Sequence, residues 1–183
     1  FDTLETIFSP SLDPIYCEGD DDIILVGIPT GGTFSTSPFI VNGNTFSPRI
    51  TGNSVITYQF TDNNGCHTRI DQPISVIAKP LTDFEMAIEC SKQKVLLTDI
   101  TTFSSSTTDY IDEWIWNFGD GTTSSNTNPT HNYNSGVFDV YLVSDNSVCT
   151  DTLFLNNLIE IGGVMTTDFT SNVNTICESD SVS

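Results

Sequence analysis

The chain has 183 residues, with 5 Lys and Arg against 24 Asp and Glu, which gives a formal net charge of −19. This charge excludes sequence-independent binding to nucleic acid, which requires clusters of Lys and Arg, and it disfavours binding to anionic membranes. No apolar run approaches the roughly 18 residues that span a bilayer, so we expect no direct membrane insertion. The strand formers Thr, Val, Ile, Phe and Tyr recur along the chain, which predicts an all-β fold built from antiparallel sandwiches of roughly 80–100 residues each.

The first segment repeats a pattern found late in the chain. Asp2-Thr3-Leu4 is echoed by Asp151-Thr152-Leu153, which lies in the predicted last strand of the module at 80–163. We therefore predict that residues 1–13 are the end of a preceding β module.

Residues 14–79 show the pattern of a complete antiparallel β-sandwich. Ile23–Val26 is a short apolar strand, and Val55–Phe60 alternates between two faces with the period of a half-buried strand. The turn Asn63-Asn64-Gly65 then returns the chain into a last strand that ends near Ile77. Prolines at the junctions with the neighbouring segments favour stiff connections and an elongated chain.

The densest carboxylate group of the chain opens this module. A calcium ion takes about 6–8 oxygen ligands, so these residues are candidate ligands for Ca²⁺. The alternative is a solvated acidic turn, which requires no convergence of the side chains. The candidates are Glu18, Asp20, Asp21 and Asp22.

Residues 80–163 form the next predicted sandwich, and 164–183 the truncated start of a further module. Trp114, Trp116 and Phe118 lie on one face of a predicted strand. Phe138, Val140 and Leu142 make a matching row on the return strand. We expect the two rows to build the core.

The five cysteines occur in two repeated contexts. Cys17-Glu18-Gly19-Asp20 is echoed by Cys177-Glu178-Ser179-Asp180, and the Asp-Asn turn before Cys66 is echoed before Cys149. Pairing the first kind with the second predicts the disulfides Cys17–Cys66 and Cys90–Cys149, and pairs Cys177 with a residue beyond the chain. Disulfides imply an oxidising, extracellular compartment. A zinc site is the competing interpretation, but no Cys-x-x-Cys is present.

Asp120 and His131 are the candidate acid and base of a catalytic pair. No serine at a glycine elbow and no metal-ligand helix accompanies them, so we expect no enzymatic activity. The structural alternative is that Asp120 caps its own turn, with Gly119 and Gly121 supplying unusual dihedrals. His131 would then fix the loop before the next strand.

The region from about 113 to 144 resembles the PKD family, an immunoglobulin-like β-sandwich module. Asn117 and Phe138 depart from the pattern, where the family usually carries Asp and often Tyr. The resemblance implies structural roles for the motif residues, which are Trp116, Phe118, Gly119, Asp120, Gly121, Pro129, His131, Tyr133 and Gly136.

Residues 14–79 are similar to immunoglobulin-like repeats that alternate with PKD modules in giant surface adhesins of Bacteroidetes, including gliding adhesins exported by type IX secretion. The opening Cys17–Asp20, the segment Gly31–Phe34 and the ending Asp62–Cys66 carry this similarity. It implies a non-enzymatic structural region of an extracellular adhesin or filament that projects from the cell surface and transmits force. Its partners would be neighbouring modules, and surface polysaccharide or cell-surface proteins. No cofactor other than calcium is implied.

Such surface proteins are commonly O-glycosylated at Asp-Ser/Thr followed by an apolar residue, which makes Thr3, Thr152 and Ser181 candidate sites. Three-residue matches also arise by chance in a Thr-rich chain. Two other functions stay open: a spacer or substrate-binding accessory region of a secreted polysaccharide- or protein-degrading enzyme, and a carbohydrate-binding module that uses Tyr110 or Phe103.

Overall fold

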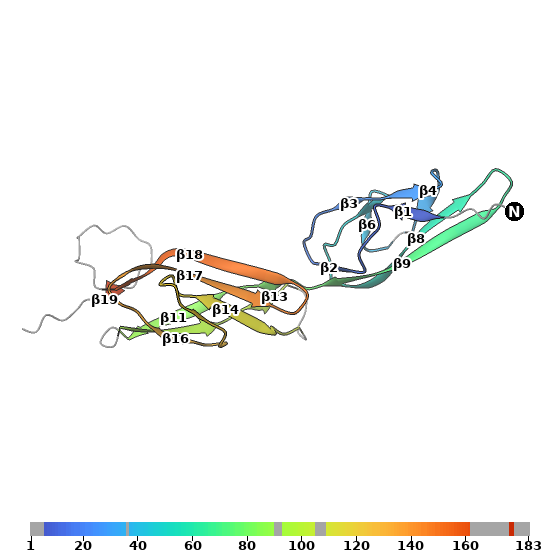
Figure 1. Cartoon of the computed structure of the whole chain (residues 1–183). Coiled ribbons are helices and arrows are strands. Elements are labelled where there is room, and N and C mark those ends of the chain that lie inside the picture. Colours follow the sequence, from blue (N-terminus) through green and yellow to red (C-terminus); the bar gives the residue numbers. More distant parts are fainter. Residues whose placement is uncertain (1–5, 36, 90–92, 105–108, 162–175, 178–183) are drawn as a thin grey trace, which may run out of the picture. The chain divides into compact units, whose positions relative to one another are not determined.

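A computed structural model describes residues 6–35, 37–89, 93–104, 109–161 and 176–177 (Figure 1). All regular elements in these ranges are strands, which confirms the predicted all-β fold. None of these residues belongs to a helix with the length and apolar character that a bilayer crossing requires. The chain divides into two compact units, and the division in the sequence falls between Lys79 and Pro80. We call them unit 1 and unit 2.

The described residues of unit 1 form nine strands in three antiparallel or mixed sheets. The sheet orders are β2-β9-β8-β5, β3-β7-β6 and β1-β4. The longest feature is the β8–β9 hairpin, whose register runs from Gly52 opposite Val76 to Thr61 opposite His67. The strands are β1 (Ile7–Ser9), β2 (Ile15–Cys17), β3 (Ile23–Ile24), β4 (Val26–Ile28), β5 (Thr33–Phe34), β6 (Ile40–Val41), β7 (Thr45–Phe46), β8 (Gly52–Thr61) and β9 (His67–Ile77).

The core of unit 1 is built from one face of the long hairpin. Ile56 and Tyr58 are buried and Val55 is 47% exposed, as the predicted alternation along β8 requires. Thr57 departs from this alternation, because it lies on the same side of the strand as Val55 and is only 8% exposed. The buried set comprises Leu12, Leu25, Phe39, Phe46, Ile56, Tyr58, Ile74 and Val76.

The start of the chain belongs to unit 1, which corrects the placement of residues 1–13 in a preceding module. β1 pairs with β4 from Ile7 opposite Ile28 to Ser9 opposite Val26. Leu12 is 7% exposed and packs in the core of unit 1. Pairing and burial therefore tie the described part of this segment to the residues that follow it, and the echo with 151–153 is a likeness of strand composition alone.

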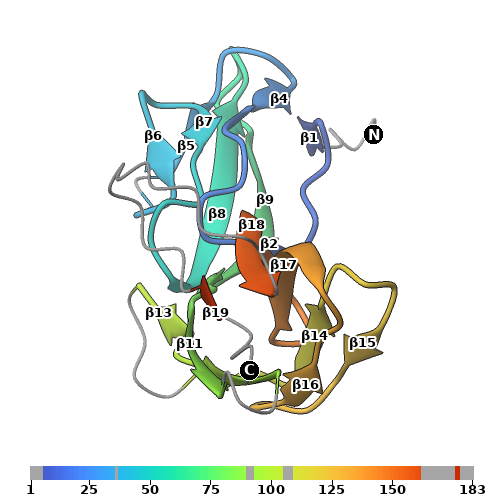
Figure 2. The ribbon, with the colours of Figure 1, turned by 90° about the vertical axis from the view of Figure 1, so that its left-hand side faces the viewer.

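Unit 2 is a sandwich of two main sheets, which Figure 2 shows with β11 on one side and β14 and β17 on the other. Their strand orders are β11-β12-β16 and β15-β14-β17-β18-β19, and β10 pairs separately with β13. The strands are β10 (Pro80–Leu81), β11 (Phe84–Glu89), β12 (Lys94–Asp99), β13 (Thr102–Phe103), β14 (Glu113–Asn117), β15 (Thr123–Ser124), β16 (Thr130–Asn132), β17 (Gly136–Asp145), β18 (Thr150–Ile161) and β19 (Ile176–Cys177).

Trp116 is the centre of the unit 2 core. It is completely buried, its ring contacts Phe84 edge-on at 5.1 Å, and its indole Nε1 donates to the carbonyl of Asn126 at 2.9 Å. Phe118, Val140 and Leu142 are also buried, so the predicted core rows are confirmed at these positions. The indole therefore combines apolar burial with a satisfied donor, as a buried tryptophan requires.

The described end of the chain also pairs within unit 2. β19 runs parallel to β18, with Glu160 opposite Ile176 and Ile161 opposite Cys177. These two residues were expected to belong to a further module beginning at 164, and in the structure they extend the five-stranded sheet instead. The remaining residues of that predicted module lie outside the described ranges.

Candidate functional site

The acidic turn after β14 is organised around the carboxylate of Asp120. Its Oδ1 accepts hydrogen bonds from the amide of Thr122 at 3.0 Å and from the Thr122 hydroxyl at 2.6 Å. The Phe118 amide closes the turn on the carbonyl of Thr122 at 3.2 Å. Gly119 and Gly121 have φ of +80° and +90°, values that residues with a Cβ rarely adopt. Glycines on both sides thus allow the carboxylate to face back onto its own turn.

Gly119 also lies against β17. A Cβ built on this glycine would lie 2.3 Å from the backbone oxygen of Asp139, which is closer than real Cβ contacts come. The Gly119 amide donates to Asn117 Oδ1 at 2.9 Å. Asn117, which stands where the PKD pattern usually has Asp, therefore keeps the acceptor that the turn uses. The amide nitrogen of its side chain donates to the Tyr141 hydroxyl at 3.3 Å.

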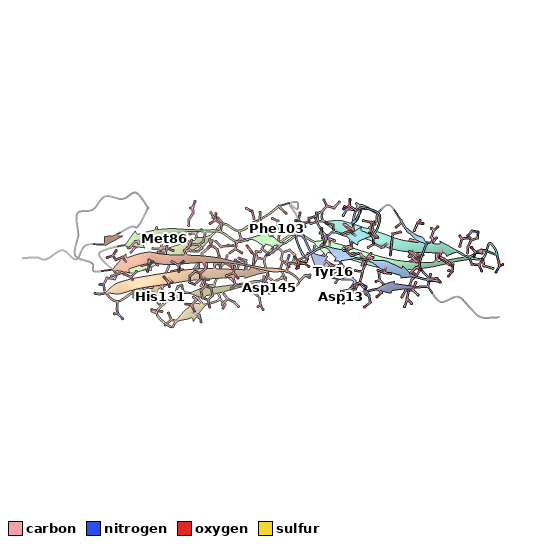
Figure 3. The ribbon with its side chains drawn as sticks, turned by 90° about the horizontal axis from the view of Figure 1, so that it is seen from above. Asp13, Tyr16, Met86, Phe103, His131 and Asp145 are labelled. Atoms are coloured by element: carbon pink, nitrogen blue, oxygen red, sulfur yellow. The ribbon has the colours of Figure 1, made fainter. Side chains whose placement is uncertain are left out.

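His131 joins the turn from β16 (Figure 3). Its Nε2 lies 2.7 Å from Asp120 Oδ2, and the two side chains are 17% and 24% exposed. The imidazole stacks on Phe118 at 4.2 Å with 7° between the planes, and it meets the ring of Tyr133 edge-on at 4.6 Å. The contact between His131 and Asp120 therefore links the turn of one sheet to a strand of the other.

The pKa of Asp120 reflects opposing effects. Partial burial acts to raise the pKa of the carboxyl, but the hydrogen bonds from Thr122 and His131 outweigh it and lower the pKa to about 2. Burial raises the pKa of the Tyr133 hydroxyl, and the nearby charge of Asp120 acts in the same direction. Asp120 is thus a firmly ionised acceptor at neutral pH, which suits a structural anchor better than a general base.

The geometry of these groups determines what they can do chemically. The Thr122 hydroxyl donates its proton to Asp120, and the facing nitrogen of His131 is engaged by the same carboxylate. The same carboxylate therefore bonds both its own turn and the imidazole on β16. The arrangement therefore locks the β14–β15 turn to β16.

The predicted calcium ligands do not converge. Asp22 Oδ1 accepts from the Ser47 hydroxyl at 2.7 Å and from Arg49 at 3.2 Å, and Asp20 Oδ2 accepts from the amide of Cys17 at 2.9 Å. The hydrogen bond from Ser47 is the largest cause that lowers the pKa of Asp22, with Arg49 contributing further. Within the described ranges, no three His, Cys, Asp or Glu residues are grouped so that they could hold a metal ion.

The structure corrects one of the predicted disulfides. Cys66 is a free, exposed thiol, whereas Cys17 is disulfide-bonded, so the predicted Cys17–Cys66 bond is wrong. The physical reason is the length of β9: Cys66 precedes His67 at one end of it, and Cys17 is opposite Ile77 at the other. Eleven extended residues separate these ends by about 33 Å, far beyond the Cα separation of roughly 4.4–6.8 Å that a disulfide allows.

Cys149 is also disulfide-bonded, which confirms that the chain carries disulfides. Its predicted partner Cys90 lies outside the described residues.

The other predicted surface sites are placed in part. Thr152 is exposed on β18, while Thr3 and Ser181 lie outside the described residues. Tyr110 is 72% exposed, and Phe103 pairs with Pro80 through β13.

The polar contacts of Tyr58 in unit 1 were not predicted from the sequence. Its hydroxyl donates to the carbonyl of Pro29 at 2.5 Å and accepts from the amide of Gly32 at 2.8 Å. Cβ atoms on Gly27 and Gly32 would lie 2.0 Å and 2.5 Å from the ring. The spacing of these glycines around Pro29 is a signal from which a side chain packed against bare backbone could have been predicted.

Two packed antiparallel sheets around a buried tryptophan define unit 2 as an immunoglobulin-like β-sandwich. Residues 78–153 match the family model described as PKD domain, and this part of the chain is a PKD domain. The match covers the acidic turn, His131 and the core rows. PKD domains occur in extracellular bacterial proteins, and disulfides persist in oxidising compartments, so both observations indicate an extracellular protein.

Solved structures similar to this chain include two PKD domains from Vibrio. The PKD1 domain of Epp from Vibrio anguillarum is 23% identical, with a TM-score of 0.36, over 42% of this chain and 87% of that one. The PKD1 domain of the metalloprotease PrtV from Vibrio cholerae is 26% identical, with a TM-score of 0.35, over 43% of this chain and 98% of that one. No curated protein matches the chain.

Proposed function

We propose that the chain is a non-enzymatic structural region of a large extracellular adhesin or filament, in which tandem β-sandwiches project from the cell surface and transmit force. The observation that supports this most directly is the Asp120–His131 contact. This contact ties the turn after β14 in one sheet of the PKD domain to β16 in the other. A module whose motif residues fix its own two sheets suits the role of a scaffold.

The acidity of the chain agrees with a surface role. A net charge of −19 keeps neighbouring modules soluble and mutually repelling, and the disulfide-bonded cysteines suit an oxidising exterior. The similarity of residues 14–79 to repeats of Bacteroidetes adhesins adds a finer proposal. In it, the protein is exported by type IX secretion and acts in surface attachment or gliding, with polysaccharide or surface proteins as partners.

Labelling of intact source cells tests the proposal. Antibodies raised against the 183-residue chain should label the outer surface by immunogold electron microscopy, and the protein isolated from these cells should contain many further β-sandwich modules. Deletion of its gene should reduce attachment or gliding. A protein recovered from the medium with a catalytic domain on the same polypeptide would overturn the proposal and establish the accessory role in a secreted enzyme.

A further inference from the structure

We propose that the parallel pair of β2 and β9 is the element of unit 1 that bears load when the chain is pulled along its length. This inference deepens the proposed function, and it rests on that function for its biological setting. It names the contacts through which tension would pass.

The pair joins the first part of unit 1 to its last strand. Ile15, Tyr16 and Cys17 lie opposite Ser75, Val76 and Ile77 in parallel register. Two backbone hydrogen bonds extend the contact at its ends. The amide of Ser75 donates to the carbonyl of Pro14 at 2.9 Å, and the amide of Glu18 donates to the carbonyl of Ile77 at 2.8 Å. The hydrogen-bonded contact thus runs along 14–18.

The direction of the strands determines how they resist force. Tension from the N-terminal side first loads β1, which pairs with β4 over three residues, and it loads β2 once β1 has detached. It leaves β9 from its C-terminal side at the Lys79–Pro80 junction. Because the strands are parallel, the two forces point in opposite directions along one axis. The hydrogen bonds between them are then loaded together in shear, and they cannot open one after another as they do when a hairpin is pulled apart from its end.

Side-chain packing holds both strands in this register. The ring of Tyr16 packs on Phe46 with 4.6 Å between centroids, and Val76 is 2% exposed. Immediately after β2, the amide of Gly19 donates to the carbonyl of Pro48 at 2.8 Å. Sliding of β2 along β9 would therefore break these contacts together with the backbone hydrogen bonds.

Unit 2 provides an internal comparison. Its first long strand, β11, pairs with β12, whereas β18 pairs with β17 and β19 in the other sheet. In the described residues, the parallel pairing of an early strand with the last long strand of the same unit is therefore a feature of unit 1.

Single-molecule force spectroscopy on the full 183-residue chain tests the proposal, with attachment tags fused at both ends. A reductant is present throughout, because the disulfide of Cys17 would otherwise add a covalent restraint to β2. Failure of the pair should release the chain from Ile15 to Ile77, on the order of 220 Å at roughly 3.6 Å per residue. Unfolding of unit 2 from Phe84 to Ile161 would release about 280 Å, so the two events are separable.

A matched pair of proline variants isolates the load-bearing bonds. Glu18→Pro removes the amide that donates to Ile77, while Ile15→Pro removes one on the other side of β2. The backbone groups of alternate residues in a strand point toward the same neighbouring strand, and those of Pro14 and Glu18 point toward β9. The amide of Ile15 therefore points away from β9. At constant force, Glu18→Pro should speed the 220 Å event about three- to tenfold, the factor expected for one hydrogen bond. Ile15→Pro should leave its rate within about twofold.

A third variant separates mechanical from thermal stability. Thr57→Val removes the 2.6 Å hydrogen bond to Asp71 elsewhere in unit 1, so it should lower the melting temperature without changing the rate of the 220 Å event under load. Equal acceleration by all three variants, or acceleration that only follows their melting temperatures, would overturn the proposal. That result would leave the surface location and attachment role untouched, because those are measured on cells.

Discussion

Alanine substitutions at Gly119 and Gly121 separate two energetic costs of adding a side chain, which are backbone strain and steric collision. Both have positive φ, +80° and +90°, so alanine at either position is strained by its backbone. Around Gly121 nothing lies within 4 Å of a built Cβ, whereas at Gly119 the Cβ would meet the backbone oxygen of Asp139 at 2.3 Å. Gly121→Ala therefore measures the dihedral cost alone, and Gly119→Ala measures that cost plus a collision with β17.

The magnitudes follow from these two terms. A left-handed conformation costs an L-residue roughly 1–2 kcal/mol, and the loss of unfolded-state freedom on replacing glycine returns about 0.4–1 kcal/mol. Gly121→Ala should thus destabilise unit 2 by about 1 kcal/mol. A methyl group forced against packed backbone adds roughly 1–3 kcal/mol, since a strand must shift. We expect Gly119→Ala to cost about 2–4 kcal/mol.

Urea unfolding followed by tryptophan fluorescence measures the difference. The chain has 2 tryptophans, Trp114 and Trp116, and both lie in β14 of unit 2, so the signal reports this unit without contribution from unit 1. Equal losses in the two variants would refute the close approach of Gly119 to β17. A loss below about 0.3 kcal/mol at both positions would refute the positive dihedrals as well.

Three further predictions concern the same unit and the cysteines. The folded-state pKa of Asp120 is lowered from 3.8 to about 2, so the stabilisation from its contacts is present above pH 4 and is lost as the pH falls toward 2. Asp120→Asn should therefore remove about 1–2 kcal/mol of unfolding free energy at pH 7 and flatten the acid limb of a curve of unfolding free energy against pH. An unchanged acid limb would contradict the assigned contacts. Trp116→Ala should cost about 3–5 kcal/mol in urea melts, whereas Tyr110→Ala at a 72% exposed position should stay within about 0.5 kcal/mol; similar losses would place Trp116 outside the core. Iodoacetamide without reductant should modify Cys66 and spare Cys17, as read by peptide mass mapping, and modification of Cys17 would show that it is not bonded.

The core of unit 2 could be predicted from sequence because its signals are local. Trp116 and Phe118 share a face of one strand by its period of two, and the glycines on both sides of Asp120 mark a turn by their own dihedral freedom. Such information lies within a few residues of the feature it describes. His131 was recognised from its place in the same ordered motif.

The disulfides could not be predicted in the same way, because they depend on distance in space. The sequence context of Cys66 correctly indicates a turn, since Asp62 Oδ1 accepts from the amides of Asn64 and Cys66 at 2.8 Å each. That turn lies at the far end of a ten-residue strand from the region of Cys17. Similar local sequences therefore marked similar turns and gave no information on which thiols meet.

The start of the chain was misplaced for a related reason. Ile7–Ser9 has the composition of any exposed strand, so its likeness to a later strand carried no information on its partner. The partner is β4, and the burial of Leu12 in the unit 1 core fixes the connection. Strand pairing depends on long-range contacts that short segments do not encode.

The close packing of Tyr58 against Gly27 and Gly32 has a consequence for variation among related chains. Neither glycine leaves room for a Cβ while the ring is present, and the ring hydroxyl depends on the turn that joins them. Gly27 and Tyr58 should therefore change together. Where a relative carries a smaller residue in place of Tyr58, a side chain should appear at Gly27, and a replacement at Gly27 should be rescued by trimming the aromatic ring. Gly32 should stay glycine in either case, because its Cβ would also lie 2.2 Å from the backbone oxygen of Gln59.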